Sequence, residues 1–211
     1  LASGSYDASR ARLLDLSYWR ALADAEGLHV CSATPVATSS SHAFATPKPN
    51  ARPECNTSEL RASLDARGYF IAPTPVASAE TLRGLCAMSR RLRSLGFAPA
   101  FLYVFDEAWE LLLECWRLSA RVLGLDSPSE LVLEPTVFAH ALERPAAGAT
   151  PSSSLQRHSY VGGNFGLPHR DHSSSDCFSP RGSPTLLSLW CPLNAVAVDN
   201  GCMHVVPKEF D

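Results

Sequence analysis

The sequence predicts a mainly β fold with supporting α-helices, and the main observations come from its C-terminal half. Residues 186–193 and 203–206 are largely apolar on both faces, as expected for strands buried between a second sheet and helices. Turn-forming residues separate them at Asp199-Asn-Gly201, a combination typical of a tight connection. Two amphipathic helices precede these segments and could cover one face of the sheet. We therefore expect a double-stranded β-helix, a cupin-like jelly roll, that is incomplete at its C-terminus.

The first 57 residues form an Ala/Ser/Pro-rich leader that we expect to be partly disordered, with one candidate amphipathic helix over residues 9–25. The expected domain spans residues 58–211. It opens with a short helix at 58–64, ended by Gly68, and a strand at 69–72. A helix from Ser78 to near Gly96 has apolar residues on one face, and a second helix covers 106–123 and stops at Gly124. The expected strands then follow at 130–142, 159–165, 168–172, 185–193 and 202–206, with a low-complexity insertion at 145–156.

Composition limits the classes of function. Hydrophobic residues make up 45% and charged residues 18% of the chain, which suits one globular domain, and no apolar run is long enough to cross a bilayer. The net charge of −3 gives no strong nucleic-acid signal. Seven cysteines, an odd number without a Cys-x-x-Cys pair, indicate free thiols in a reducing intracellular compartment, the cytoplasm being the simplest choice.

The motif with the clearest chemistry is His169-Arg-Asp171. In a strand, residues two apart point to the same face, so His169 and Asp171 can offer one imidazole nitrogen and one carboxylate oxygen to a single cation, while Arg170 points away. Completed by a second imidazole, this pair gives the facial triad of non-heme Fe(II) oxygenases. The alternative is a surface loop whose charges form ion pairs, because a spacing this short occurs often by chance.

The surrounding residues favour the metal. A glycine-rich approach, Gly162-Gly-Asn-Phe-Gly166, precedes the motif, and a segment bearing Trp190 and then Asp199-Asn-Gly201 and Val205-Val-Pro207 follow it. This order resembles the phytanoyl-CoA dioxygenase-like family of Fe(II)/2-oxoglutarate-dependent oxygenases, most clearly over residues 164–211. Residues 64–75 resemble the opening strand of that family more loosely.

The resemblance implies an enzyme that hydroxylates a C–H bond of a small organic or acyl substrate. It would use Fe(II) as metal and 2-oxoglutarate as co-substrate, with ascorbate as a candidate reductant, and no membrane partner is expected. His169 and Asp171 are the implied metal ligands. Trp190 matches a family tryptophan beside the co-substrate, and Asn164 and Ser173 are candidates to hydrogen-bond its carboxylate.

In the family, the second histidine and the 2-oxoglutarate-binding arginine lie after the Val-Val-Pro segment, and this sequence ends at Asp211. We therefore expect a piece of a longer protein that lacks both, binds Fe(II) weakly and is inactive alone. Within the sequence, His204 is the remaining candidate for a third ligand. His172 would point to the opposite strand face.

Two other functions stay open at this point. The first is a catalytically inactive jelly-roll module that binds or scaffolds, which residues other than histidine and arginine at the two later positions would indicate. The second is a cupin-type metal isomerase or dioxygenase. Such a cupin-type site requires two or three histidines clustered on the first metal strand. The sequence His169-Arg-Asp171-His172 fits that pattern less well.

Overall fold

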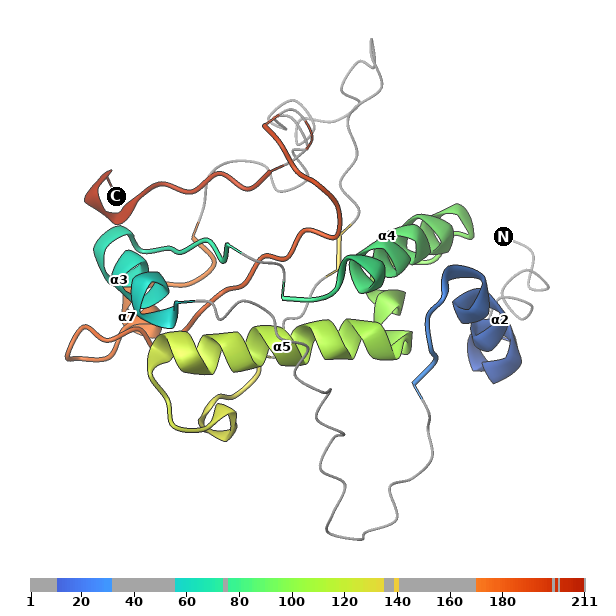
Figure 1. Ribbon diagram of the computed structural model, residues 1–211, viewed down its shortest axis with the longest axis horizontal. Coiled ribbons are helices and arrows are strands. Elements are labelled where there is room, and N and C mark those ends of the chain that lie inside the picture. Colours follow the sequence, from blue (N-terminus) through green and yellow to red (C-terminus); the bar gives the residue numbers. More distant parts are fainter. Residues whose placement is uncertain are drawn as a thin grey trace, which may run out of the picture.

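The computed structural model describes residues 11–31, 56–73, 76–134, 139–140, 170–198, 200 and 202–210. Within these ranges the chain is mainly helical (Figure 1). Its α-helices are α2 (Leu16–Glu26), α3 (Thr57–Arg67), α4 (Ala79–Ser94), α5 (Asp106–Leu123) and the single turn α7 (Ser174–Cys177). Three short 3₁₀ helices accompany them: η1 (Pro99–Val104), η2 (Pro128–Glu130) and η3 (Lys208–Phe210).

Local signals in the sequence account for the helix ends. The Ser78 hydroxyl caps α4 by accepting a hydrogen bond from the N–H of Thr81 at 3.0 Å. Gly124 ends α5 in the left-handed conformation, with φ of 73°, which glycine adopts without steric cost. The predicted helices over 78–96 and 106–123 are therefore confirmed to within one or two residues at each end. The helix predicted at 58–64 is also present, but Asn56 caps it and it runs on to Arg67.

The predicted helix at 9–25 is only partly correct. Asp15 interrupts it and caps α2 by accepting a hydrogen bond from the N–H of Ser17 at 2.9 Å. Trp19 and Leu22, from the expected apolar stripe, are buried, whereas Leu13 and Leu16 remain exposed. The stripe therefore contributes to the core only after the cap.

Two groups of buried residues hold the helices together. The first cluster joins α2, α4, η1 and the start of α5, and its buried members are Trp19, Leu22, Ala23, Leu28, Leu85, Met88, Leu92, Leu102, Phe105 and Ala108. Trp19 stacks on Phe101 with ring centroids 5.6 Å apart. The second cluster joins α3 to the last turns of α5 through Leu60, Leu118 and Val122. Figure 1 shows α5 running between these two groups of helices.

The predicted mainly β jelly roll is wrong for the described residues. They contain no sheet, and their only β pairing consists of two isolated bridges, Val30 with Phe105 and Phe178 with Pro184. The predicted strands at 69–72, 185–193 and 202–206, and the described parts of those at 130–142 and 168–172, form no ladder. The strand at 159–165 and the insertion at 145–156 lie outside the described residues.

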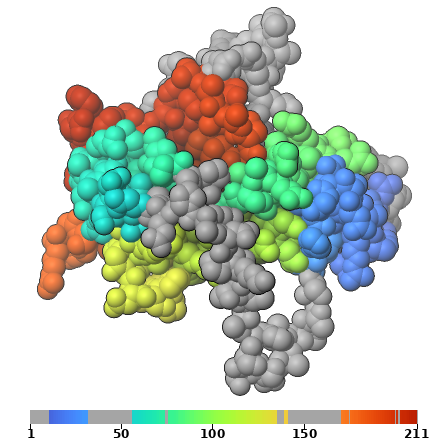
Figure 2. All heavy atoms as spheres, viewed as in Figure 1, coloured from blue at the N-terminus to red at the C-terminus, as the bar shows by residue number. Residues whose placement is uncertain are grey.

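The physical reason is the lack of lateral partners. A strand is held by backbone hydrogen bonds to a neighbouring strand, and β-branched composition alone does not provide them. Residues 185–193 instead carry no regular secondary structure, and residues 202–206 lead on to η3 beside α3 (Figure 2). Val132, Val198 and Val206 are accordingly exposed rather than packed between two layers.

None of the helices in the described ranges combines the length and the apolar character that crossing a membrane requires.

Candidate functional site

Of the two predicted metal ligands, the structure places one. Asp171 lies in an exposed bend three residues before α7. His169 and the predicted co-substrate residue Asn164 lie outside the described residues, so the described part of the chain gives no geometry for the His169–Asp171 pair. His172, next to Asp171, is half-buried.

Ser173, a predicted co-substrate residue, makes local contacts that begin α7. Its carbonyl accepts hydrogen bonds from the N–H groups of Asp176 and Cys177 at 3.1 and 3.2 Å. Its hydroxyl donates to the Asp176 carboxylate at 2.6 Å and lies 2.7 Å from the hydroxyl of Ser175. Because these contacts are all within four residues, they account for Ser173 as a helix-start residue.

The segment that bears Trp190 contacts α5 and the first cluster through two of its half-buried side chains. Cys191 has its Sγ 3.3 Å from that of Cys115 in the middle of α5, and Leu193 packs against the first cluster. Residues two apart in an extended chain share a side, which accounts for the common direction of Cys191 and Leu193. Trp190, the residue before Cys191, keeps 40% of its surface exposed. Its ring is therefore accessible to a ligand.

The predicted turn before the Val-Val-Pro segment is present. The N–H of Asn200 donates to the carbonyl of Ala197 at 3.0 Å, and its side-chain amide donates to the carbonyl of Ala195 at 3.0 Å. The Asn200 side-chain oxygen also accepts from the N–H of Ala197. Asn200 therefore supplies most of the hydrogen bonds of the turn, as expected for a residue whose side chain mimics backbone hydrogen bonding, and the N–H of Cys202 adds one to the carbonyl of Ala197 at 3.3 Å.

His204, the candidate third ligand, is exposed on the segment after this turn. Its Nε2 lies 3.6 Å from the Sγ of Cys202, which is a local contact between side chains two residues apart. Among the described residues, no three His, Cys, Asp or Glu side chains lie close enough to hold a metal ion. The described residues therefore hold no complete metal site by themselves, and the jelly-roll expectation is corrected for this part of the chain. The donor types of His169 and Asp171 suit two positions around Fe(II), and the described residues add no third.

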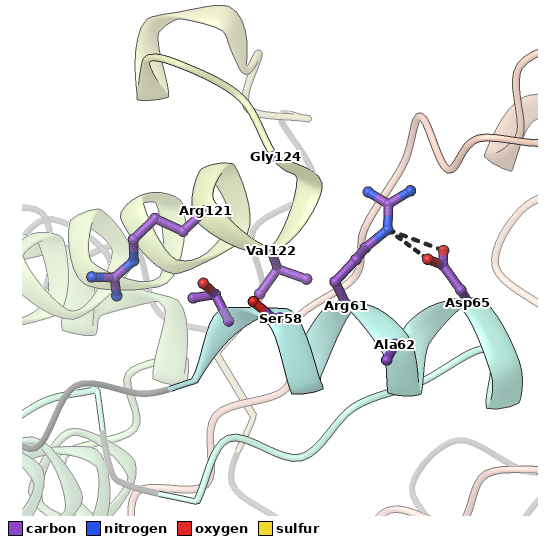
Figure 3. A pocket seen from close by; sticks show the side chains of 8 residues that line it. Ser58, Arg61, Ala62, Asp65, Arg121, Val122 and Gly124 are labelled. Atoms are coloured by element: carbon purple, nitrogen blue, oxygen red, sulfur yellow. Dashed lines mark hydrogen bonds and ion pairs between the residues drawn. The ribbon is translucent and has the colours of Figure 1, made fainter.

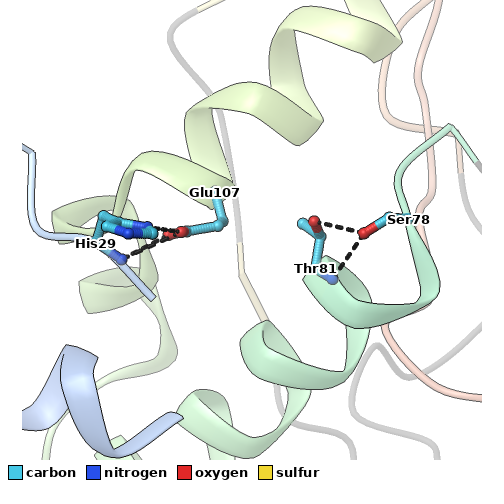
Figure 4. A network of polar contacts seen from close by, with 4 residues as sticks. All are labelled: His29, Ser78, Thr81 and Glu107. Carbon is cyan, nitrogen blue, oxygen red and sulfur yellow. Dashed lines mark hydrogen bonds and ion pairs between the residues drawn. The ribbon is translucent and has the colours of Figure 1, made fainter. Parts of the chain in front are cut away.

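The best-defined polar contact between distant segments was not expected from the sequence. Glu107, at the start of α5 and only 8% exposed, accepts hydrogen bonds from the backbone N–H of His29 at 3.1 Å to each carboxylate oxygen. Its Oε1 also lies 2.7 Å from the Nδ1 of His29 (Figure 4). This hydrogen bond and the negative charge of Glu107 raise the pKa of His29 above its usual value. His29 carries no motif, so no signal in the sequence could have identified it.

Two open pockets occur in the described residues, and neither includes a predicted site residue. The larger, of about 420 Å³, lies between the start of α3 and the end of α5 and is lined by Thr57, Ser58, Arg61, Ala62, Asp65, Arg121, Val122 and Gly124 (Figure 3). Its Arg61 is already paired with Asp65 at 2.9 Å and donates to the carbonyl of Leu123 at 3.1 Å. The smaller, of about 260 Å³, lies beside His29.

Comparison of the chain with family models, with curated proteins and with solved structures finds no match.

Proposed function

We propose that this chain contributes two ligands, the imidazole of His169 and the carboxylate of Asp171, to a mononuclear Fe(II) centre of a 2-oxoglutarate-dependent oxygenase. The observation that carries the proposal is the order of motifs along the sequence. His169-Arg-Asp171 is followed by the segment bearing Trp190, then by an Asn-Gly turn and a Val-Val-Pro segment. One imidazole nitrogen and one carboxylate oxygen are ligands typical of this class of iron site.

Three properties of the described residues support the proposal. Asp171 is exposed in a bend rather than engaged in the helical core. Residues 185–193 are not helical despite their apolar composition, and Asn200 closes the turn that the motif order requires. The mainly β fold is contradicted by the structure and forms no part of this proposal.

In such a site, the chain would hold and orient the metal, and bound Fe(II) would supply the activation of O2 that is coupled to the decarboxylation of 2-oxoglutarate. His169 and Asp171 would supply two of the protein ligands of the ion, and the class of site keeps further positions for the co-substrate. The substrate class that goes with this proposal is a small organic or acyl compound oxidised at a C–H bond. Trp190, with its accessible ring, is the residue proposed beside the co-substrate.

The test is anaerobic calorimetry of Fe(II) binding to the chain, with and without 2-oxoglutarate. Two protein ligands predict weak binding that 2-oxoglutarate strengthens, because the co-substrate adds donor atoms to the same ion. We expect His169→Ala and Asp171→Ala each to weaken binding by at least about tenfold, since even the loss of a residue that only orients a ligand costs about 10–100-fold. His172→Ala is the matched control, because it removes a neighbouring imidazole and should leave the affinity unchanged.

Equal binding by all four proteins would overturn the proposal. The chain would then be better described as a non-catalytic binding or scaffold module, in which the His-x-Asp spacing has no metal role. A parallel measurement of succinate formation from 2-oxoglutarate separates metal binding from catalytic turnover. Metal binding without succinate formation would support the ligand pair and show that turnover needs further ligands.

A further inference from the structure

Two cysteines distant in the sequence meet inside the molecule. Cys115 lies in the middle of α5 and is 6% exposed, and Cys191 follows Trp190 in the segment that lies along that helix. Their sulfur atoms are 3.3 Å apart although 76 residues separate them. Cys191 is only half-buried, so a small oxidant can reach it. This is a contact between two thiols, not a disulfide, because a disulfide has its sulfur atoms about 2.05 Å apart.

The environment gives the two thiols different properties. The pKa of Cys191, the more exposed of the two, is lowered by its hydrogen bond with Cys115, in the arrangement in which the buried Cys115 thiol is the donor. The pKa of Cys115 is raised, first by donating that hydrogen bond and then by burial, and the negative charge of Glu114 acts in the same direction. Cys191 is therefore the thiol that ionises first, and Cys115 is held protonated beside it.

Cys31, another of the described cysteines, has a different environment. Burial and the neighbouring Asp106 raise the pKa of Cys31 to about 12, which keeps that thiol protonated at neutral pH. Burial is the main cause of the raised pKa of Tyr103, and electrostatic interactions with Cys191 and Cys115 raise it further. A raised pKa keeps the phenol uncharged, so it adds no competing charge next to Cys191.

We propose that Cys115 and Cys191 form a peroxide-oxidisable dithiol, in which Cys191 is the reacting thiolate and Cys115 the resolving thiol. The Cys191 thiolate attacks one oxygen of hydrogen peroxide, the O–O bond breaks, and the products are a sulfenic acid on Cys191 and, after protonation, water. The Cys115 sulfur then attacks the Cys191 sulfur, its proton leaves with the hydroxyl group as a second water, and the disulfide forms. Two thiols are thus oxidised by two electrons while one peroxide is reduced to two waters.

The surroundings permit the final approach of the two sulfur atoms. Cys115 is fixed by the helix, whereas Cys191 belongs to a segment without a hydrogen-bonded ladder, so its backbone and χ1 can adjust by the roughly 1 Å that bond formation needs. The product would anchor residues 185–193 covalently to α5 and hold the adjacent Trp190 in place. Reduction would release both again. This inference is independent of the proposed iron site, because neither cysteine is a predicted metal ligand.

The experiment is peptide mapping of the full chain after oxidation. The reduced protein is treated with one equivalent of hydrogen peroxide, its remaining thiols are blocked with N-ethylmaleimide in denaturant, and unreduced digests are analysed by mass spectrometry. We expect two fewer free thiols than the seven in the sequence. A single cross-linked peptide pair containing Cys115 and Cys191 should appear and should disappear on treatment with dithiothreitol.

Variants assign the two roles. Cys191→Ser should leave Cys115 unoxidised, whereas Cys115→Ser should leave a Cys191 sulfenic acid that dimedone traps. Cys86→Ser, which removes a half-buried thiol of α4, should behave as the unmodified chain does. A cross-link between other cysteines, or further oxidation of Cys191 in the unmodified chain without a cross-link, would overturn the proposal. Because the map of the unmodified chain gives either answer, the test does not depend on the buried Cys115→Ser variant folding.

Discussion

The carboxylate of Glu107 binds both the backbone and the imidazole of His29, a residue 78 positions earlier in the chain. Two further contacts accompany it: the N–H of Asp106 donates to the carbonyl of His29 at 2.9 Å, and Val30 forms a β-bridge with Phe105. Together they attach the segment after α2 to the first turn of α5. An acidic residue in this turn is also favoured by the positive end of the helix dipole.

The protonation of His29 should make stability depend on pH. Its pKa is raised in the folded chain, chiefly by the hydrogen bond and charge of Glu107, with smaller effects from Asp106 and Glu110. The stabilisation is therefore complete below the unfolded pKa of about 6.5 and is lost as pH rises through the higher folded value. Because the imidazole is 79% exposed, solvent screening limits the effect to at most about 1 kcal/mol.

Thermal melts in low salt check this expectation. They are recorded between about pH 5 and 9, because this range covers the titration of a histidine. His29→Gln should reduce the fall in melting temperature that accompanies rising pH. His204→Gln, which replaces an exposed histidine outside the clusters, should leave that fall unchanged. An unchanged pH profile in His29→Gln would contradict the assignment.

Removing the Glu107 carboxylate should be more costly than removing a nearby exposed one. Glu107→Ala leaves the backbone N–H of His29 without the acceptor it has in the folded chain and opens a space beside the first cluster. A lost acceptor for a buried donor costs about 1–3 kcal/mol of unfolding free energy. Urea denaturation measures the change, with Glu110→Ala, on the exposed side of α5, as the control expected within about 0.5 kcal/mol of the parent.

The helices could be predicted because their determinants are local. Ser78 begins α4 and Gly124 ends α5 at the expected places, and the apolar spacing of Leu85, Met88 and Leu92 gives the buried face of α4. Each of these signals depends on residues within about one turn of the position concerned. The η1 helix was missed, although Pro99 at its first turn is a recognisable start signal.

The strands that fall within the described residues were predicted wrongly, and two contacts between distant segments were not predicted, because their determinants are distant in the sequence. The segment around Trp190 has the composition of a buried strand, yet strand formation depends on partners elsewhere in the chain. The Glu107–His29 and Cys115–Cys191 contacts bridge 78 and 76 residues and involve no spacing that a sequence pattern could reveal. The His169–Asp171 pair remains a prediction, since its histidine lies outside the described residues.

Gly84 should resist substitution although it lies inside a helix. A Cβ at this position would meet Leu28 Cδ2 at 2.8 Å and the carbonyl oxygen of Glu26 at 3.1 Å, because α4 passes close to the end of α2. Alanine gains about 1 kcal/mol in helix propensity, but overpacking costs about 1–3 kcal/mol, so we expect Gly84→Ala to be destabilising by about 1 kcal/mol.

A double-mutant cycle with Leu28→Ala, measured by urea denaturation, isolates the cause. With the Leu28 side chain shortened, Gly84→Ala should become neutral or stabilising, since much of the close contact is gone. A destabilisation of equal size in both backgrounds would instead attribute the effect to something other than the contact with Leu28.

Charged substitutions on the C-terminal segments should improve solubility. Val198 and Val205 are 71% and 50% exposed and lie on chain that has no ladder partner among the described residues, a combination that favours association between molecules. We expect the double variant Val198→Lys, Val205→Lys to stay soluble at a higher concentration, measured after ultracentrifugation, with no loss in melting temperature. Leu193→Lys, which disturbs the first cluster, should lower the melting temperature instead.

The position of α5 between the two clusters has a consequence for how the chain opens. Its 18 residues span about 27 Å at 1.5 Å per residue, with Ala108 packed in the first cluster and Leu118 and Val122 in the second. Fluctuations that detach α3 from one end leave the contacts of α2 and α4 at the other end intact. Amide hydrogen exchange should therefore divide the described chain into two cooperative units, with the central turns of α5, which connect the two clusters, exchanging last.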